Sequence, residues 1–261
     1  MRMLIALFAA AALTATTFAG PSDVKMLLND PMHSGMWSFH QKAILGDPDS
    51  IRFDSRVVVR APAYAEDSLA VPVLVDASAI PDVERIVLFA DYGPIPEILT
   101  FYPGRAKPKL GFRFKIDQTT PIRAAVRTHS GTWHVGATAI DAAGGGCTAP
   151  AAAYATADWE EDLMKVTGAV WPESGRVKVT VDHPMDTGLA DGIPVFIIQH
   201  VDVADEAGDA LARIELHEPV SEDPTFTMFL PEGERHESVR VSGRDNNGGR
   251  FDATLRPLLL Q

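Results

Sequence analysis

The sequence contains a single cysteine among its 261 residues. One thiol cannot form an intramolecular disulfide, and no CxxC motif is possible. The sequence also lacks GxSxG, HExxH and a Gly-rich loop between a strand and a helix, so it shows none of these hydrolase, zinc-protease or phosphate-binding motifs. The candidate functional residue is therefore the cysteine itself, Cys147. An odd cysteine in an exported protein indicates intermolecular pairing or a free reactive thiol.

Basic residues are scarce in the second half of the chain. Residues 148–261 contain 9 Lys and Arg against 21 Asp and Glu, whereas residues 20–147 contain 13 against 14. Such acidity makes nucleic acid or an anionic membrane surface an unfavourable partner. The change of charge after Cys147 indicates two domains, over 20–147 and 166–261, joined by a Gly/Ala-rich linker over 148–165.

Long helical patterns are absent, apart from a mildly helical segment over 30–45. Short segments of alternating apolar and polar residues, separated by Pro and Gly clusters, predict antiparallel β-sandwiches. The expected strands cover 56–60, 70–75, 85–90, 111–116, 122–127, 132–137, 176–181, 193–198, 212–216, 225–230, 238–242 and 250–255. A further short helix is expected over 158–165, capped by Asp158. The fold class is therefore all-β, with two sandwiches in tandem.

The first 19 residues have the pattern of a signal peptide. A short positive start at Arg2 precedes an apolar run over 4–13, and Thr17-Phe18-Ala19 forms a small-x-small cleavage site. The run is shorter than the ~20 residues that span a bilayer. We expect export, a periplasmic location in a Gram-negative cell, and no membrane insertion after cleavage.

Several motifs resemble those of bacterial sulfur oxidation. Asp91-Tyr-Gly-Pro-Ile-Pro96 resembles the NPxP segment of the SoxY sulfur carrier of thiosulfate oxidation, and Gly145-Gly146-Cys147 resembles its GGC motif. In the second half, residues 183–188 (HPMDTG) resemble the HPMxTG motif of its partner SoxZ. In this order, the motifs are similar to fused SoxYZ-like carriers associated with periplasmic quinoprotein dehydrogenases. The resemblance implies two immunoglobulin-like β-sandwiches with a cysteine arm.

The resemblance implies a non-catalytic carrier that needs no cofactor. Cys147 would hold a covalent thio intermediate, and Gly144, Gly145 and Gly146 would make its strip flexible and exposed. Periplasmic redox enzymes, of the Sox type or of a quinoprotein dehydrogenase system, would be the partners. The chain departs from the separate carrier because it continues through Thr148-Ala149-Pro150, which tethers the strip at both ends.

Other candidate sites favour a structural role. His183, Pro184, Met185 and Gly188 fit a turn after a strand, and we expect a domain-interface or loop-shaping role for them. His and Met suit copper, and Met32, His33, Met36 and His40 raise that alternative. Their helical spacing is more typical of packing and surface positions, so no metal site is predicted.

Two alternatives to a carrier remain open. The protein is an accessory binding protein for a periplasmic alcohol-oxidising quinoprotein if Cys147 is dispensable, because sandwich edges serve for protein docking. A thiol-based enzyme such as a peroxidase is the weaker alternative, since no basic residue flanks Cys147 to activate it.

Overall fold

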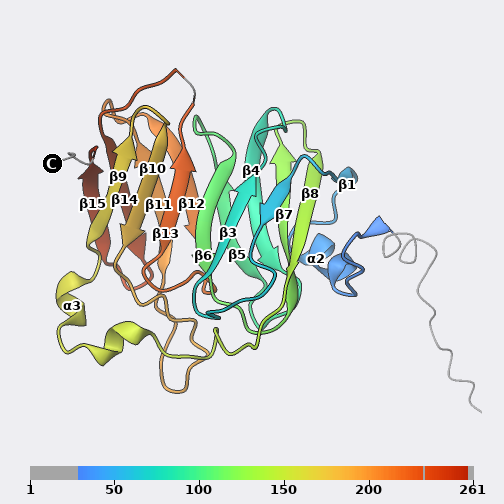
Figure 1. Ribbon diagram of the computed structural model, residues 1–261, viewed down its shortest axis with the longest axis horizontal. Coiled ribbons are helices and arrows are strands. Elements are labelled where there is room, and N and C mark those ends of the chain that lie inside the picture. The colour runs from blue at the N-terminus through green and yellow to red at the C-terminus, as the bar shows by residue number, and fades with distance from the viewer. Residues whose placement is uncertain (1–28, 232, 258–261) are drawn as a thin grey trace, which may run out of the picture.

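The computed structural model describes residues 29–231 and 233–257, so the predicted signal peptide over 1–19 lies outside the described residues. Strands dominate the described chain, and the helical elements are short (Figure 1). They are α2 (Trp37–Ala43), the 3-10 helix η1 (Ala152–Ala155) and α3 (Trp159–Asp162). Within the described residues, no helix has the length and apolarity to cross a membrane.

Two sheets face one another, and each runs through both halves of the chain. The nine-stranded sheet has the order β1-β8-β7-β4-β5-β12-β11-β14-β15, and the six-stranded sheet has the order β2-β3-β6-β13-β10-β9. The strand bounds are β1 (Ile51–Phe53), β2 (Val58–Arg60), β3 (Val71–Asp76), β4 (Val83–Ala90), β5 (Glu97–Tyr102), β6 (Lys109–Phe114), β7 (Thr120–Thr128), β8 (Trp133–Ile140), β9 (Val166–Trp171), β10 (Arg176–Val181), β11 (Ile198–Ala204), β12 (Ala210–Leu216), β13 (Thr225–Phe229), β14 (Val239–Asp245) and β15 (Arg250–Leu255).

The two halves are joined by backbone pairing in both sheets. Strand β5 pairs antiparallel with β12, where Phe101 faces Ile214, and β6 pairs antiparallel with β13, where Leu110 faces Met228. Pairing satisfies edge N–H and C=O groups that an isolated sandwich would leave open. One hydrophobic core continues from the first half into the second. The predicted all-β, immunoglobulin-like class is confirmed, and the sandwiches are continuous rather than merely in contact.

Some predicted elements differ from the observed ones. Residues 193–197 are not a strand, because Phe196 makes only an isolated bridge to Asp186 and β11 begins at Ile198. Strands β1, β5 and β9 were not predicted, and the strand expected over 193–198 overlaps β11 only at Ile198. The N-terminal helix covers only Trp37–Ala43, and Asp158 makes no side-chain capping bond to α3.

Candidate functional site

Cys147 lies at the seam between the two halves, and its side chain is buried. The residue is 3% exposed, and Sγ lies 3.7 Å from the carbonyl oxygen of Lys115. Tyr92 and Ile95 from the covering loop (91–96) and Pro219 from the second half line the space beside the thiol, which measures only about 10 Å³. The expectation of an exposed thiol was wrong, because the fold brings apolar groups that are distant in sequence over Cys147.

Gly144 and Gly146 pack closely against the backbone that precedes β3 and the backbone that follows β6. A Cβ on Gly144 would lie 2.3 Å from the carbonyl oxygen of Asp117, and one on Gly146 would lie 2.0 Å from that of Ser68. The Gly146 N–H donates to Ile116 O at 3.0 Å. Glycine is thus required here for close backbone approach. The flexibility predicted for Gly144, Gly145 and Gly146 stays a prediction.

The 183–188 motif of the second half reaches the cysteine directly. The Thr187 hydroxyl donates to the carbonyl oxygen of Cys147 at 2.5 Å. The Lys115 ammonium donates to the carbonyl oxygen of Met185, also at 2.5 Å. Two buried hydrogen bonds therefore hold the first half's cysteine end against the second half's motif.

His183 is enclosed inside that motif rather than presented to a reactant. Its Nδ1 accepts the Met185 N–H at 3.0 Å, and its ring lies 4.3 Å from the ring of Phe196. Nε2 makes no hydrogen bond with a described residue and lies 3.9 Å from Asp245 Oδ2. Burial, with a smaller contribution from Lys115, lowers the pKa of His183 to about 3. The imidazole is therefore neutral at physiological pH.

Met185, Pro184 and Gly188 shape the turn around these contacts. Met185 is buried with a φ of 49°, and its Sδ accepts the Ile198 N–H at 3.3 Å. Gly188 has a φ of 77°, and a Cβ there would lie 2.6 Å from Val195 Cγ2. Pro184 is buried as well. The motif consequently positions the Met185 and Thr187 groups that meet the first half.

Burial is the main influence on the thiol's acidity. It raises the pKa of Cys147 from 9.0 to about 11; Asp117 adds to the increase, and Lys115 opposes it. Burial also lowers the pKa of Lys115, while Asp186, Glu222 and Cys147 act in the opposite direction. In this closed arrangement Cys147 is a protonated thiol at neutral pH. The thiolate is the nucleophilic form, so the closed thiol is poorly reactive.

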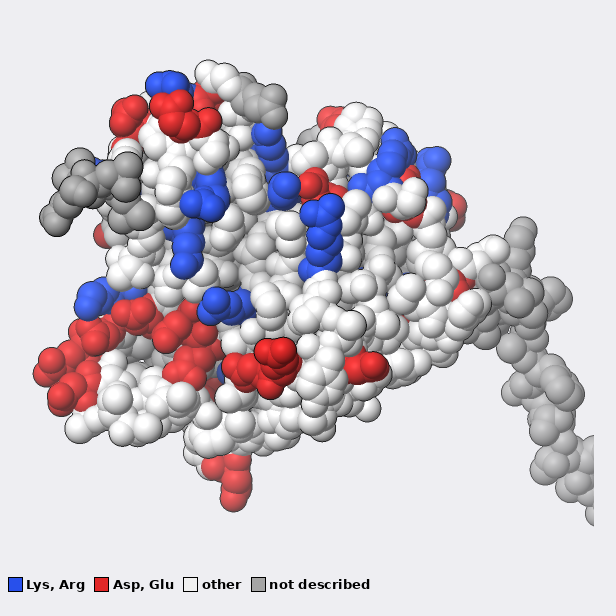
Figure 2. All heavy atoms as spheres, in the orientation of Figure 1, with Lys and Arg blue, Asp and Glu red and all other residues white. Residues whose placement is uncertain are grey.

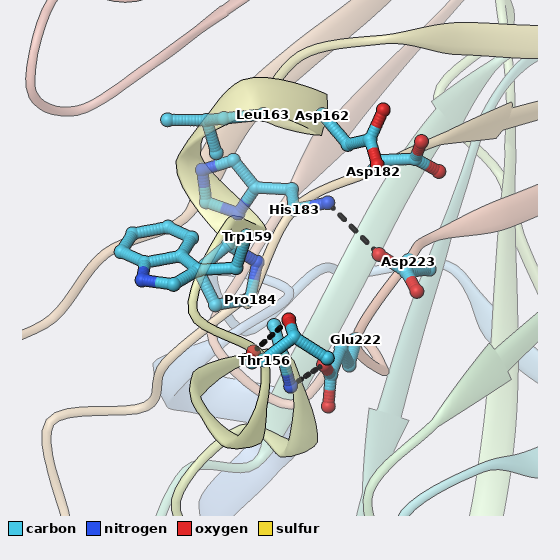
Figure 3. A pocket seen from close by; sticks show the side chains of 10 residues that line it. Thr156, Trp159, Asp162, Leu163, Asp182, His183, Pro184, Glu222 and Asp223 are labelled. Atoms are coloured by element: carbon cyan, nitrogen blue, oxygen red, sulfur yellow. Dashed lines mark hydrogen bonds between the residues drawn. The ribbon is translucent and has the colours of Figure 1, made fainter.

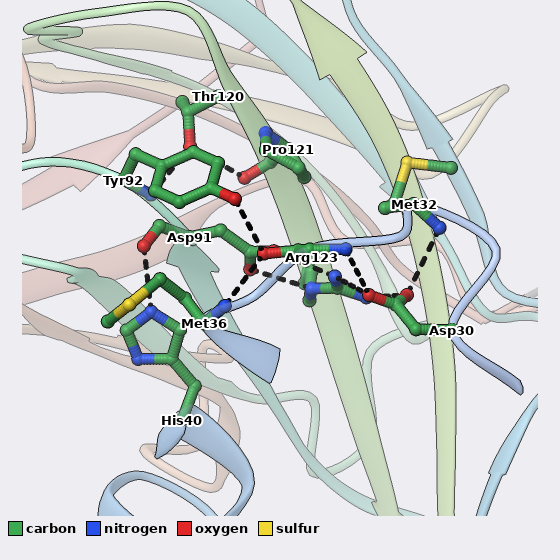
Figure 4. A network of polar contacts seen from close by, with 10 residues as sticks. Asp30, Met32, Met36, His40, Asp91, Tyr92, Thr120, Pro121 and Arg123 are labelled. Atoms are coloured by element: carbon green, nitrogen blue, oxygen red, sulfur yellow. Dashed lines mark hydrogen bonds and ion pairs between the residues drawn. The ribbon is translucent and has the colours of Figure 1, made fainter. Parts of the chain in front are cut away.

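A buried ion-pair network holds the covering loop in place (Figure 4). Arg123 is fully buried and donates to Asp91 at 2.7 Å and to Asp30 at 2.8 and 2.9 Å. His40 Nε2 donates a hydrogen bond of 2.8 Å to the carbonyl oxygen of Asp91. Next in the loop, the Tyr92 N–H donates to Thr120 Oγ1 at 2.8 Å. The N-terminal segment and the loop over Cys147 are therefore fixed to the same arginine.

The linker after Cys147 is anchored to the second half. Glu222 accepts the N–H groups of Ala152 and Ala153 at 2.7 and 2.6 Å, and the Tyr154 hydroxyl donates to Asp186. Beyond these anchors, α3 carries exposed acidic side chains. Figure 2 shows Asp and Glu gathered at this lower-left end of the molecule.

A pocket of about 380 Å³ lies between the linker and the 183–188 motif (Figure 3). Trp159 and Leu163 form its apolar side, and four carboxylates also line it. Burial, together with Asp223 and Asp162, raises the pKa of Asp182. Over residues 29–231 and 233–257, no group of three or more His, Cys, Asp or Glu is arranged to hold a metal ion.

Lys115 and Thr187 were missed as site residues by the sequence analysis. They lie 32 and 40 positions from Cys147, so no local spacing connects them. Lys115 also follows the alternation of residues 112–116 as a polar position, which predicts exposure, so no local signal indicated its burial.

Comparisons with known proteins divide the chain in two. Residues 41–147 match the family Sulfur oxidation protein SoxY, and residues 171–256 match the family Sulphur oxidation protein SoxZ. Among solved structures, the sulfur carrier protein SoxY from Chlorobium limicola f thiosulfatophilum aligns at 23% identity and a TM-score of 0.37, over 41% of this chain and 96% of its own. No curated protein sequence matches the chain.

Proposed function

We propose that Cys147 is the covalent attachment point of this chain, which is a SoxY domain followed by a SoxZ domain. This is the arrangement of a fused SoxYZ-like protein with a carrier role in sulfur oxidation. The observation that carries the proposal is the position of the thiol. Cys147 is the last residue of the SoxY match, and the described chain holds no other cysteine. Its carbonyl oxygen is bound by Thr187 of the SoxZ-like half.

The attachment chemistry is a thiol exchange. The Cys147 thiolate attacks one sulfur of a disulfide-type donor, a new S–S bond forms, and the donor's S–S bond breaks. The leaving thiolate takes up the proton that Cys147 lost, so the exchange needs no external oxidant or reductant. The chain contributes one nucleophile, Cys147, which becomes accessible when the closed arrangement opens, and the surface from which partner enzymes take the group.

Loading requires movement of the glycine strip (144–147). The space of about 10 Å³ beside Sγ holds at most about one water-sized sphere, which is too small for an added sulfur group. The closed arrangement is therefore the unloaded state. Glycine at 144 to 146 allows the backbone to move away once the contacts of Cys147 with the Thr187 hydroxyl and the Lys115 carbonyl oxygen break.

The partners we propose are Sox-type sulfur oxidation enzymes or a quinoprotein dehydrogenase system in the periplasm. The signal-peptide pattern over 1–19 supports export to that compartment. We expect no turnover by the isolated chain, since burial of its one thiol raises the thiol pKa and disfavours the nucleophilic thiolate.

Intact-mass measurement of the protein purified from its native cells without reductant tests the attachment. We expect an added mass that a reductant removes and that maps to Cys147, with the Cys147→Ser protein as the control. A thiol that is unmodified under sulfur-oxidising growth contradicts the proposal. If a Cys147→Ser strain also retains the phenotype that a deletion strain loses, the protein acts as an accessory binding protein instead.

A further inference from the structure

The covering loop over the thiol is held by a segment from outside the SoxY match. Residues 30–40, which we call the latch, end where the SoxY match begins. The His40 ring donates from Nε2 to the carbonyl oxygen of Asp91 at 2.8 Å, and the Ser34 hydroxyl donates to the Tyr92 hydroxyl at 3.3 Å. The first two residues of the loop are therefore bound to the latch (Figure 4).

The latch packs on an apolar cluster of its own rather than on the large core. Trp37 lies with Phe89 and Trp133 in a cluster that is separate from the core joining the two halves. Leu88, next to Phe89 in β4, belongs to that core, so the two clusters lie on opposite faces of the nine-stranded sheet. A segment that packs outside the main core opens locally at a lower free-energy cost than global unfolding. Release of the latch therefore leaves both sheets paired.

His40 contributes a hydrogen bond that its packing does not require. The residue is 2% exposed, and its ring lies 5.5 Å from the ring of Phe89. Nδ1 is buried and makes no hydrogen bond with a described residue, which is unfavourable for a polar atom. A phenylalanine would keep the ring contact without this unpaired nitrogen. The bond from Nε2 to Asp91 is therefore the interaction that distinguishes histidine at this position.

The loop that the latch holds lines the space beside the thiol. Tyr92 and Ile95 border this space of about 10 Å³, which admits no reactant while the loop is closed. We propose that the latch keeps the covering loop closed over Cys147, and that its release precedes the movement of the glycine strip that exposes the thiol. This inference rests on the proposed function, because it assigns control of access to the same attachment residue.

Alkylation of the single cysteine measures this control directly. The ratio of the iodoacetamide rate of the urea-unfolded protein to that of the folded full-length protein gives the protection factor of Cys147. We expect His40→Phe to lower this factor about tenfold and Tyr92→Phe to lower it about threefold. Each variant removes one hydrogen bond of the closed loop and keeps an aromatic ring in place. Urea unfolding shows that each variant is folded and gives its free energy of unfolding.

His134→Phe is the matched control. His134 is also a buried histidine, but it belongs to β8 and its Nδ1 pairs with Asp54 at 2.7 Å. Its replacement should leave the protection factor unchanged. Unchanged protection in folded His40→Phe and Tyr92→Phe proteins overturns the inference. Decreases in all three variants in proportion to their losses of unfolding free energy also overturn it, because the thiol would then be exposed only by global unfolding. The measurement uses unloaded protein, so its result is independent of whether the native adduct is found.

Discussion

Thr187 Oγ1 donates a hydrogen bond of 2.5 Å to the carbonyl oxygen of Cys147, which joins the SoxZ-like motif to the last residue of the SoxY match. Both residues are buried. This contact makes the second half part of the environment of the thiol rather than a neighbouring scaffold.

We expect Thr187→Val to increase the alkylation rate of Cys147. The substitution keeps the shape of the side chain but leaves the Cys147 carbonyl without its donor, which costs about 1–2 kcal/mol in the closed state. The equilibrium constant for opening of the glycine strip should therefore increase about fivefold or more. Iodoacetamide labelling followed by intact mass measures the rate at neutral pH. Thr227→Val, on β13, is the control. Equal alkylation rates in the wild type and in both variants would show that the Thr187–Cys147 hydrogen bond does not limit opening.

The stability of the protein should fall at alkaline pH because of Cys147. The pKa of the buried thiol is raised to about 11, so the folded state keeps its proton while the unfolded chain loses it near pH 9. This contribution is complete below pH 9 and is lost as the pH rises through about 11, with a loss of about 2 kcal/mol by that pH. Urea unfolding from pH 8 to 11 should show this extra slope in the wild type and not in Cys147→Ser. If the unfolding free energies of the two proteins change with pH in parallel, the raised pKa of Cys147 is contradicted.

His183 should give the opposite dependence at acid pH. Its pKa is lowered to about 3 by burial, whereas in the unfolded chain it titrates near 6.5. Stability is therefore complete above pH 6.5 and falls as the pH drops toward 3, by about 3 kcal/mol between pH 7 and 4. His183→Asn, whose side-chain oxygen replaces Nδ1 as acceptor, should lose most of this slope in urea unfolding. The exposed His129→Asn should retain it; if both variants retain it, His183 is not the group responsible.

The sequence was most informative where a local pattern decides the structure. Strands over 176–181 and 250–255 were predicted with the observed bounds, since alternating side chains face core and solvent there. The pattern failed over 193–197, which lies outside both sheets, with Pro194 and Val195 exposed. Phe196 instead covers His183. A run of apolar residues does not reveal which surface it covers.

The candidate site could be predicted only in part. Cys147 was identified because three glycines precede it and because it is the single cysteine, and both features are visible in the sequence. Its burial depends on Tyr92, Lys115 and Pro219, which only the closed fold brings together. Likewise, pairing of β5 with β12 connects positions more than 100 residues apart, and no sequence period reports such a contact.

Removal of Arg123 should be among the most destabilising single substitutions. Arg123→Met leaves Asp30 and Asp91 as buried carboxylates without their cation, a change that typically costs about 3–5 kcal/mol. Arg127→Met is the matched control from the same strand, because its partner Glu84 is partly exposed and such pairs contribute about 1 kcal/mol or less. Chemical unfolding measures both. Similar losses for the two variants would mean that the Arg123 network is not the anchor of the N-terminal segment.

Proteolysis at the linker should cut the chain without separating its halves. Residues 155–158 are exposed, as are Glu160 and Glu161 of α3, whereas Cys147 and Ala151 are buried. A glutamate-specific protease should therefore cleave first after Glu160 or Glu161. The fragments should stay together in gel filtration, because the pairs β5–β12 and β6–β13 and the common core hold the halves independently of the linker. Unfolding in urea should separate the fragments. Early cleavage elsewhere would show that the linker is not the most accessible segment. Separation of the fragments under native conditions would show that the linker rather than the shared sheets keeps the two halves joined.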